Sequence, residues 1–392
     1  MKKVFISILT LYNGGAERSL INFLNALPKD EYEIDLMLFK NEGLFLKQVP
    51  PWVHVLSDDE KPEGLKRLYG PIAKSGKYIP LKFLGTSVSK ICERKNDYSG
   101  FRWKYFYGPS IAPLKKQYDI ALAYLSGEVL YFVDEKVTAT RKIAWIHNDY
   151  KSTTHPANFD YPHLENMDRI VTISDKCLDI LKDVFPELAN RMLYLPNISS
   201  ENMIKAKAEE FIPKEYDANI YTILSIGRIC AQKGYDYAID AAKILQEKGI
   251  KFHWFIMGEG PLLNELSERV YKYHLEQYVK FIGTRENPYP YIKFANLIAQ
   301  TSRFEGKSVV LDEAKIMGKV VLATDYPTVK DQIISGKTGW IVDMEPEAIA
   351  RGIELLMNNN QLTESIDNYL KNNKFGNQDD IQKYIDLLEG KL

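Results

Sequence analysis

The chain has 392 residues, of which 45% are hydrophobic and 26% are charged, and its net charge is −1. This length predicts two domains of ordinary size, and the composition is typical of a soluble globular protein. A net charge this close to zero gives no electrostatic support for nucleic-acid binding. No apolar run reaches the roughly 18 residues that a transmembrane helix needs, so none is expected. Three cysteines without a Cys-x-x-Cys pair indicate a reducing cytoplasm and argue against a zinc site.

The first half of the chain alternates short apolar runs with amphipathic helical patterns, which predicts a parallel sheet covered by helices. The expected elements are strands at 3–9, 33–39, 118–124, 141–146, 169–174 and 191–195, and helices at 19–26 and 176–185.

Two glycines, Gly14 and Gly15, stand between the first expected strand and the first expected helix. Because glycine lets the backbone approach an anion closely, this turn is a candidate phosphate-facing loop. A plain tight turn between a strand and a helix accounts for the same residues, so both interpretations stay open.

Residues 61–116 differ in composition from the rest of the chain. They contain thirteen Lys and Arg residues and three Asp and Glu residues, a net charge of +10, interleaved with nine aromatic residues. One interpretation is a solvated helical face. The other is a surface for anionic lipid headgroups or a lipid-pyrophosphate acceptor, with the aromatic side chains at the interface.

A histidine, His147, comes directly after the expected strand 141–146. Parallel sheets of this kind place their ligands just beyond the carboxyl ends of the strands. His147 is therefore a candidate site residue, although a histidine with a structural role is the ordinary alternative.

The second half begins with a polar, charged stretch, 201–217, which is expected to be an interdomain linker. A second series of alternating elements follows it. The expected strands are 221–226, 251–257, 279–282, 297–299 and 319–323, and the expected helices are 237–248, 262–274, 289–294, 309–317, 331–335, 346–358, 362–369 and 381–388.

The stretch 301–319 contains two glutamates, Glu305 and Glu313, that stand eight positions apart. Gly306 permits a tight turn, and Ser308 is a good N-cap for a helix from Val309. The unpaired N–H groups and positive dipole end of that helix make a site for a phosphate, with Glu305 beside the anion. Glu313 is then expected about 7 Å further along, which is the span from a diphosphate to a ribose.

This stretch resembles the Glu-x7-Glu motif of retaining nucleotide-sugar glycosyltransferases with the GT-B fold, in particular glycosyltransferase family 4. The segment 336–342, Gly-Lys-Thr-Gly-Trp-Ile-Val, is similar to that family's strand near the C-terminus. Gly227-Arg228 and Lys233-Gly234 resemble the segment in which Arg and Lys bind the two phosphates. The chemistry agrees, because two fixed cations stabilise a leaving diphosphate without a metal ion.

The resemblance implies an α/β protein of the GT-B type, with two Rossmann-like domains whose parallel sheets face each other across a cleft. The expected boundaries are 1–200 for the acceptor-side domain, 201–218 for the linker, 219–375 for the nucleotide-sugar domain and 376–392 for a helix that crosses back to the first domain.

The resemblance also implies a retaining transfer of a hexosyl unit from a nucleotide sugar, with a UDP-sugar favoured and no cofactor or metal ion. Glu313 is expected to bind the ribose, Glu305 and the amides of 306–308 the sugar, and the loop at Thr284 and Arg285 the nucleobase. The expected catalytic residues are Glu305, His147, Arg228 and Lys233. The expected nucleotide-sugar-binding residues are Gly14, Gly15, Arg228, Lys233, Thr284, Arg285, Glu305, Gly306, Lys307, Ser308, Val309 and Glu313.

One residue departs from the family pattern, since Lys307 stands where an aromatic or aliphatic residue is common. Its ammonium group could pair with the diphosphate, pair with an acidic sugar or point into solvent. No Asp-x-Asp sequence occurs in the chain, which disfavours the glycosyltransferase architecture that holds its donor through a carboxylate-bound metal ion.

The expected partners are the nucleotide-sugar donor, a lipid-linked or saccharide acceptor of bacterial surface polysaccharide assembly, and an anionic membrane contacted peripherally on its cytoplasmic face. Nucleic acid is not an expected partner. Because a fold does not fix a reaction, two alternatives remain: a nucleotide-sugar epimerase or hydrolase, and a membrane-docked protein that binds the nucleotide sugar without catalysis.

Overall fold

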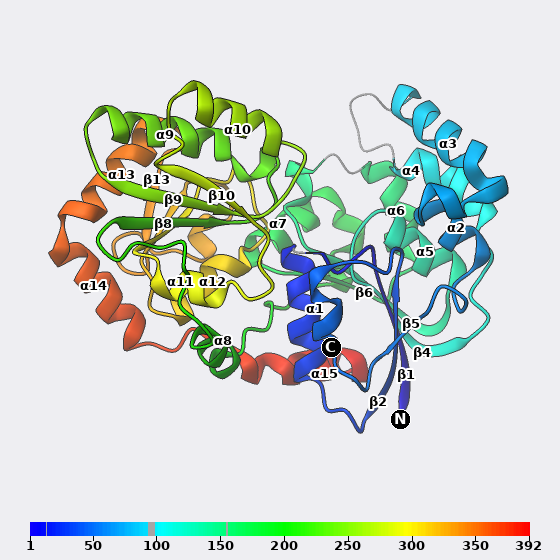
Figure 1. Ribbon diagram of the computed structural model, residues 1–392. Helices are drawn as coiled ribbons and strands as arrows, with labels where there is room; N and C mark the ends of the chain where they lie inside the picture. The colour runs from blue at the N-terminus through cyan, green and yellow to red at the C-terminus, as the bar shows by residue number, and fades with distance from the viewer. Residues whose placement is uncertain (13, 93–98, 154–155) are drawn as a thin grey trace. The chain divides into compact units, whose positions relative to one another are not determined.

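A computed structural model describes residues 1–12, 14–92, 99–153 and 156–392 of the chain (Figure 1). The chain divides into two compact units. Unit 1 holds Met1–Tyr12, Ala16–Asn197 and Asp380–Leu392, and unit 2 holds Ile198–Asp379 together with Gly14 and Gly15. Within the described ranges, no helix is both long enough and apolar enough to cross a bilayer.

Unit 1 is built on a seven-stranded parallel sheet with the strand order β3-β2-β1-β4-β5-β6-β7. The first strand of the chain, β1, pairs on both sides, with Val4 opposite Ile34 on one side and Ile120 on the other. The strands are β1 (Lys2–Ile8), β2 (Tyr32–Leu38), β3 (His54–Val55), β4 (Gln117–Ala123), β5 (Thr138–Ile146), β6 (Arg169–Thr172) and β7 (Met192–Tyr194).

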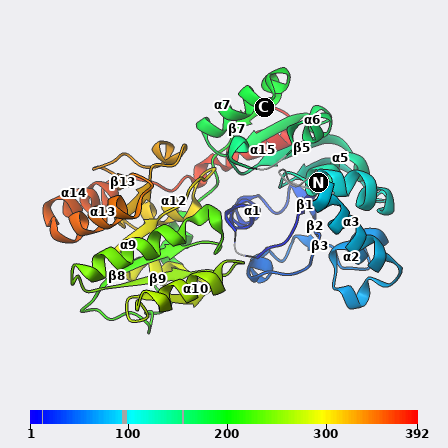
Figure 2. The ribbon, with the colours of Figure 1, turned by 90° about the horizontal axis from the view of Figure 1, so that it is seen from above.

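The helices of unit 1 pack on this sheet or on one another. They are α1 (Gly15–Ala26), α2 (Glu63–Tyr69), α3 (Ile79–Cys92), α4 (Ser99–Arg102), α5 (Glu128–Lys136), α6 (Ala157–Glu165), α7 (Asp175–Val184) and α15 (Ile381–Glu389). The last helix of the chain packs within this unit (Figure 2). Its Tyr384 ring lies 5.0 Å from the ring of Phe23 and 5.4 Å from that of Trp145, and its hydroxyl donates to the Pro196 carbonyl at 2.7 Å.

Unit 2 is built on a six-stranded parallel sheet with the order β10-β9-β8-β11-β12-β13. The strands are β8 (Tyr221–Ile226), β9 (Phe252–Met257), β10 (Val279–Gly283), β11 (Leu297–Gln300), β12 (Val321–Thr324) and β13 (Trp340–Val342). The helices are α8 (Glu201–Ala208), α9 (Tyr235–Glu247), α10 (Leu263–Lys272), α11 (Tyr289–Phe294), α12 (Val309–Ile316), α13 (Pro346–Asn358) and α14 (Asn360–Lys371).

Both faces of the second sheet are buried. Successive residues of one strand serve different cores: Trp254 of β9 packs with α9, α10 and α13, whereas Phe255 packs with α8, α11 and α12. This alternation follows from the two-residue period of a strand. It explains why the strands are continuous apolar runs, and it leaves the loops at the carboxyl ends of the strands as the place for a ligand.

The predicted architecture of two parallel-sheet Rossmann-like units is confirmed. Two local predictions need correction. The expected linker begins with helix α8, because Ser200 caps it and Ile204 and Ala208 are buried in unit 2. The expected helix at 331–335 does not form. A short 3-10 turn at Val329–Asp331 stands there instead, and the Ile334 amide that follows donates to the Thr338 hydroxyl at 2.8 Å.

The basic and aromatic segment 61–116 also differs from one expectation. Tyr69, Trp103 and Tyr107 are 7%, 0% and 3% exposed and belong to the core of unit 1, so they do not lie at an interface. The burial of these aromatic residues could not be predicted, because they alternate with lysines and arginines and the spacing alone does not show which face of a short helix turns inward.

Candidate functional site

The N-terminus of α12 is fixed by Ser308, as predicted. Its hydroxyl accepts from the Leu311 amide at 3.4 Å and donates to Oε1 of Gln300, at the end of β11, at 2.6 Å. The Gln332 side chain accepts from the Ser308 amide at 2.7 Å and donates to the Ser308 carbonyl at 2.8 Å. One expectation is thereby corrected: the Ser308 N–H group is bound by Gln332 and is not directed to a sugar.

Glu305 is held by several side chains. The residue is 7% exposed, and its carboxylate accepts from Lys233 Nζ at 2.7 Å, Ser302 Oγ at 2.6 Å and Gln300 Nε2 at 3.1 Å. A buried carboxylate is tolerable when it is paired with a cation and hydrogen-bonded in this way. The network therefore holds an ionised acceptor in one orientation, directly before the N-terminus of α12.

The same charge affects a neighbouring tyrosine, Tyr326. Burial first, and then the negative field of Glu305, raise the pKa of Tyr326 well above its usual value. Its buried hydroxyl has no hydrogen-bond partner within the described ranges. Tyr326 is therefore a neutral hydroxyl close to the predicted site that the sequence did not indicate.

The loop between β8 and α9 supplies the two predicted cations. Lys233 is paired with Glu305, whereas the Arg228 side chain is exposed. Gly234 follows with φ at 60°, and a Cβ there would lie 2.1 Å from the Thr301 carbonyl oxygen. Glycine is therefore required at this position, because it lets the loop pack against the chain just before Glu305.

Glu313 lies on α12 and is 2% exposed. The hydroxyl of Tyr289, from α11, donates to its Oε1 at 3.0 Å. This contact orients the Glu313 carboxylate on α12.

Lys307 lies close to Asp312, with its Nζ 3.9 Å from Oδ2, and its side chain is 15% exposed. Lys315 Nζ lies 3.0 Å from the other oxygen of Asp312. Burial acts to raise the pKa of Asp312, but the two lysines outweigh it and hold that pKa below its usual value. Of the three orientations that the sequence left open for Lys307, pointing freely into solvent is excluded.

The loop after β10 holds the remaining predicted residues of unit 2. Arg285 donates to Oε1 of Glu215 and to the Tyr291 hydroxyl, both at 3.1 Å. Its guanidinium is thus tied to the segment after α8. Thr284 is partly buried beside it, and Val309 is 6% exposed at the first position of α12.

In unit 1, His147 follows β5 and is 8% exposed. Neither ring nitrogen has a hydrogen-bond partner among the described residues, and the ring lies 4.9 Å from that of Tyr124. Burial lowers the pKa of His147 to about 3, and the Tyr124 backbone acts in the opposite direction. His147 is therefore a buried, neutral imidazole.

Gly14 and Gly15 stand at the start of α1, where Gly15 is exposed and Gly14 partly so. Helix α1 carries Ser19, whose hydroxyl lies 3.0 Å from the Tyr124 hydroxyl and donates to Asn197 Oδ1 at 2.7 Å. This network ties the start of α1 to the Tyr124 ring that packs on His147.

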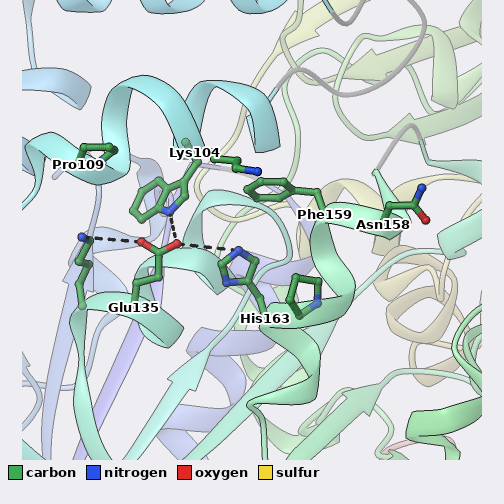
Figure 3. A pocket seen from close by; sticks show the side chains of 9 residues that line it. Lys104, Pro109, Glu135, Asn158, Phe159 and His163 are labelled. Carbon is green, nitrogen blue, oxygen red and sulfur yellow. Dashed lines mark hydrogen bonds and ion pairs between the residues drawn. The ribbon is translucent and has the colours of Figure 1, made fainter.

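A separate pocket of about 420 Å³ lies in unit 1 (Figure 3). Its wall includes Glu135, which accepts from Trp103 Nε1 at 3.0 Å, and His163, whose Nδ1 lies 2.8 Å from an oxygen of Asp134. These polar groups are already paired with one another. None of the predicted site residues lines this pocket, and we assign it no ligand.

Sequence reasoning missed the side chains that hold the predicted residues in place: Gln300, Ser302, Gln332 and Tyr289. A signal existed for the first two, because they end or follow an apolar strand, where parallel sheets gather their ligand-binding groups. Gln332 and Tyr289 lie outside the 301–319 stretch, and no local pattern marks them.

Residues 207–373 match the family model described as Glycosyl transferases group 1. An uncharacterized glycosyltransferase of Methanocaldococcus jannaschii is 28% identical over 43% of this chain and 42% of its own length. The N-acetylgalactosamine-N,N'-diacetylbacillosaminyl-diphospho-undecaprenol 4-alpha-N-acetylgalactosaminyltransferase of Campylobacter jejuni is 25% identical over 95% of this chain and 94% of its own.

Among solved structures, Anabaena HepE in complex with UDP-glucose superposes with a TM-score of 0.72 and 17% identity, covering 100% of both chains. The fold is therefore that of GT-B glycosyltransferases, as predicted. The matched domain and these relatives define the class of the protein: it is a glycosyltransferase.

Proposed function

We propose that this glycosyltransferase moves a hexosyl unit from a UDP-sugar, with retention at the anomeric carbon, to a lipid-linked or saccharide acceptor in bacterial surface polysaccharide assembly. The observation that carries the proposal is the buried Lys233–Glu305 pair, 2.7 Å apart, directly before the capped N-terminus of α12. Charge fixed by a dense network is the arrangement expected where negative charge develops during a reaction.

Each part of the donor is matched by a group of unit 2. Arg228, Lys233 and the positive end of α12 attract the diphosphate, which gains charge as the leaving group departs. Glu305 accepts hydrogen bonds from hydroxyls of the sugar, and Glu313 does so from the ribose. The backbone of the loop at Thr284 and Arg285 contacts the nucleobase.

The hydroxyl-rich sugar also needs a neutral partner. His147 supplies an imidazole that stays uncharged at physiological pH, because burial lowers its pKa to about 3. An uncharged ring can donate one hydrogen bond and accept another. We therefore assign it the role of positioning the transferred sugar.

The choice of donor and acceptor draws on relatives. HepE was crystallised with UDP-glucose, and the name of the Campylobacter enzyme specifies a diphospho-undecaprenol-linked acceptor. The acceptor proposed here belongs to the same chemical class. We place its use at the cytoplasmic face of the membrane, with the protein bound peripherally.

The proposal is tested by UDP release from a panel of UDP-hexoses, with and without a membrane lipid extract as acceptor. The expected result is release that depends on the extract, an α-linked product by the NMR coupling of its anomeric proton, and at least a hundredfold loss of turnover in Glu305→Gln. Lys272→Met, an exposed change on α10, serves as the control. Donor breakdown without any acceptor would favour a hydrolase or epimerase, and donor binding without turnover would favour a non-catalytic protein.

A further inference from the structure

Helix α3 carries its large apolar side chains on the outside of unit 1. Ile79, Phe83, Leu84 and Ile91 are 37%, 54%, 59% and 64% exposed. At 100° per residue they fall within an arc of roughly 140° on one side of the helix. Figure 1 shows α3 at the periphery of unit 1, beyond α2 and α4. We call this exposed set the α3 outer face.

The opposite side of α3 is made mostly of small residues, and Leu81 packs there, partly buried, against the core of unit 1. Gly85 and Ser89 are buried, and a Cβ at Gly85 would lie 3.1 Å from Cβ of Phe106. A surface helix of a globular protein normally buries its apolar stripe and exposes polar residues. The pattern of α3 is inverted, which is typical of a helix whose apolar side meets a second surface.

The surroundings of this face are predominantly basic. Residues 64–92 contain six Lys and Arg residues and no Asp or Glu, and two of these cations, Lys66 and Arg67, are paired with Glu63. Lys74 and Lys77, just before α3, are exposed, as is Lys104 beside the exposed Tyr105. Ile72, between α2 and α3, adds a further apolar side chain that is 52% exposed.

We infer that the α3 outer face docks onto an anionic lipid bilayer, with its apolar side chains at the level of the headgroups and its lysines on the lipid phosphates. Amphipathic helices with basic residues and Phe or Leu bind membranes in this way. A second copy of this chain is a poor partner, because pairing the two faces would bring like charges together. The biological purpose rests on the proposed lipid-linked acceptor, but vesicle binding is measured without donor or acceptor.

The test is co-sedimentation of the full chain with vesicles of phosphatidylglycerol and phosphatidylcholine, and with pure phosphatidylcholine vesicles. The wild type is expected to bind the anionic vesicles at low salt and to release them at about 1 M salt, where the screening length is about 3 Å. Phe83→Ser/Leu84→Ser should weaken binding at least about tenfold. Lys74→Glu/Lys77→Glu should weaken it about 25-fold or more, since each lysine contributes roughly fivefold.

Matched controls come from unit 2. Ile212→Ser and Tyr271→Ser remove apolar side chains that are 70% and 71% exposed, and Lys251→Glu/Lys272→Glu reverses two exposed charges. These variants should bind vesicles like the wild type. All the altered side chains are exposed, so each variant should keep the unfolding midpoint of the wild type.

The inference is overturned if the wild type does not bind anionic vesicles, or if the α3 variants bind these vesicles as tightly as the control variants do. A dimer that dissociates in Phe83→Ser/Leu84→Ser while vesicles stay unbound would overturn it too, in favour of a second copy. The thermal shift with UDP-sugars is recorded for every variant. If a variant loses vesicle binding but keeps the thermal shift with UDP-sugars, the substitution affects membrane docking and not the donor site. If the wild type binds vesicles but shows no thermal shift with any UDP-sugar, the result contradicts the proposed function and not the docking.

Discussion

At the scale of single residues, the Lys233–Glu305 ion pair of the predicted site is largely buried. The two side chains are 17% and 9% exposed. Removing one partner of a buried ion pair leaves an uncompensated charge, which costs about 3–5 kcal/mol, whereas removing both charges often costs little.

We therefore predict that Lys233→Met lowers the free energy of unfolding by about 3 kcal/mol, because the Glu305 charge loses its cation. Adding Glu305→Gln should recover most of that loss while activity stays absent. Urea unfolding of the two single variants and the double variant measures this coupling. Additive effects would show that the pair contributes little to the fold.

His147 gives a prediction about pH. Its pKa is about 3 in the folded protein, against about 6.5 when unfolded, so the unfolded state binds the proton first as pH falls. Its contribution is therefore fully present above about pH 6.5 and is lost between there and about pH 3, at up to about 1.4 kcal/mol per pH unit.

We expect His147→Gln to make unfolding less pH-dependent between pH 6 and pH 4, roughly the window set by these two values. At pH 8 it should change stability much less, because both states are then neutral at this position. Urea titrations at several pH values provide the measurement. If the slope of the unfolding free energy against pH is the same in His147→Gln as in the wild type, the pKa of His147 is not lowered by burial.

Much of the candidate site could be predicted at this scale from local sequence. Ser308 as N-cap and Glu305 before the helix followed from a turn residue, a capping residue and an apolar pattern within one stretch. The groups that orient them could not be predicted, because Gln332 and Tyr289 reach the site only through the packing of separate elements. A single sequence does not show which of its distant segments are in contact in the folded protein.

At the scale of elements, the start of α12 is held by Ser308 through the Leu311 amide and through Gln300. Substituting such a cap by alanine costs about 0.5–2 kcal/mol. Here the same change also frees Gln300, which donates to Glu305.

Ser308→Ala is therefore expected to lower stability by about 1 kcal/mol and also to weaken UDP binding by calorimetry. Ser174 is the corresponding cap of α7, and its hydroxyl accepts from the Cys177 amide at 3.1 Å. Ser174→Ala removes this cap. That control should cost similar stability and leave UDP binding unchanged. Equal UDP affinity in both variants would show that the Ser308 cap does not contribute to UDP binding.

The bounds of α13, α11 and β8 match the expected ranges, and the 13-residue helix α13 has a clear apolar period. The failures have physical reasons. The two-residue strand β3 is too short to show a period, and α8 carries many charges around a narrow buried stripe. Helix α3 has a helical period, but its apolar side faces outward, which no period reveals.

At the scale of the whole molecule, α15 joins the end of the chain to the fold of unit 1. Tyr384 is 1% exposed between Phe23 and Trp145. Removing a large buried aromatic ring costs about 3–5 kcal/mol.

Tyr384→Ala should therefore destabilise unit 1 by about 3 kcal/mol, while unit 2 still binds UDP with wild-type affinity below the unfolding transition. Trp145 stacks on this ring, so tryptophan fluorescence during urea unfolding reports the change. Tyr271→Ala, at a side chain that is 71% exposed, is the control and should have little effect. A stability loss below about 1 kcal/mol would show that α15 is not part of the core.

We propose that unit 2 binds a UDP-sugar through Glu313 and the groups before α12. The most direct measurement is a thermal-shift screen of UDP-, GDP-, ADP- and dTDP-sugars on the wild type, on Glu313→Ala and on the exposed control Glu347→Ala. Ligand at about 100 times its dissociation constant adds roughly 2.7 kcal/mol. We predict a shift with UDP-sugars in the wild type and in Glu347→Ala. The affinity of Glu313→Ala should be ten- to hundredfold weaker, since a hydrogen bond to a charged group contributes about 1.5–3 kcal/mol. No shift with any of these donors, or a UDP-sugar shift that Glu313→Ala leaves intact, would contradict it.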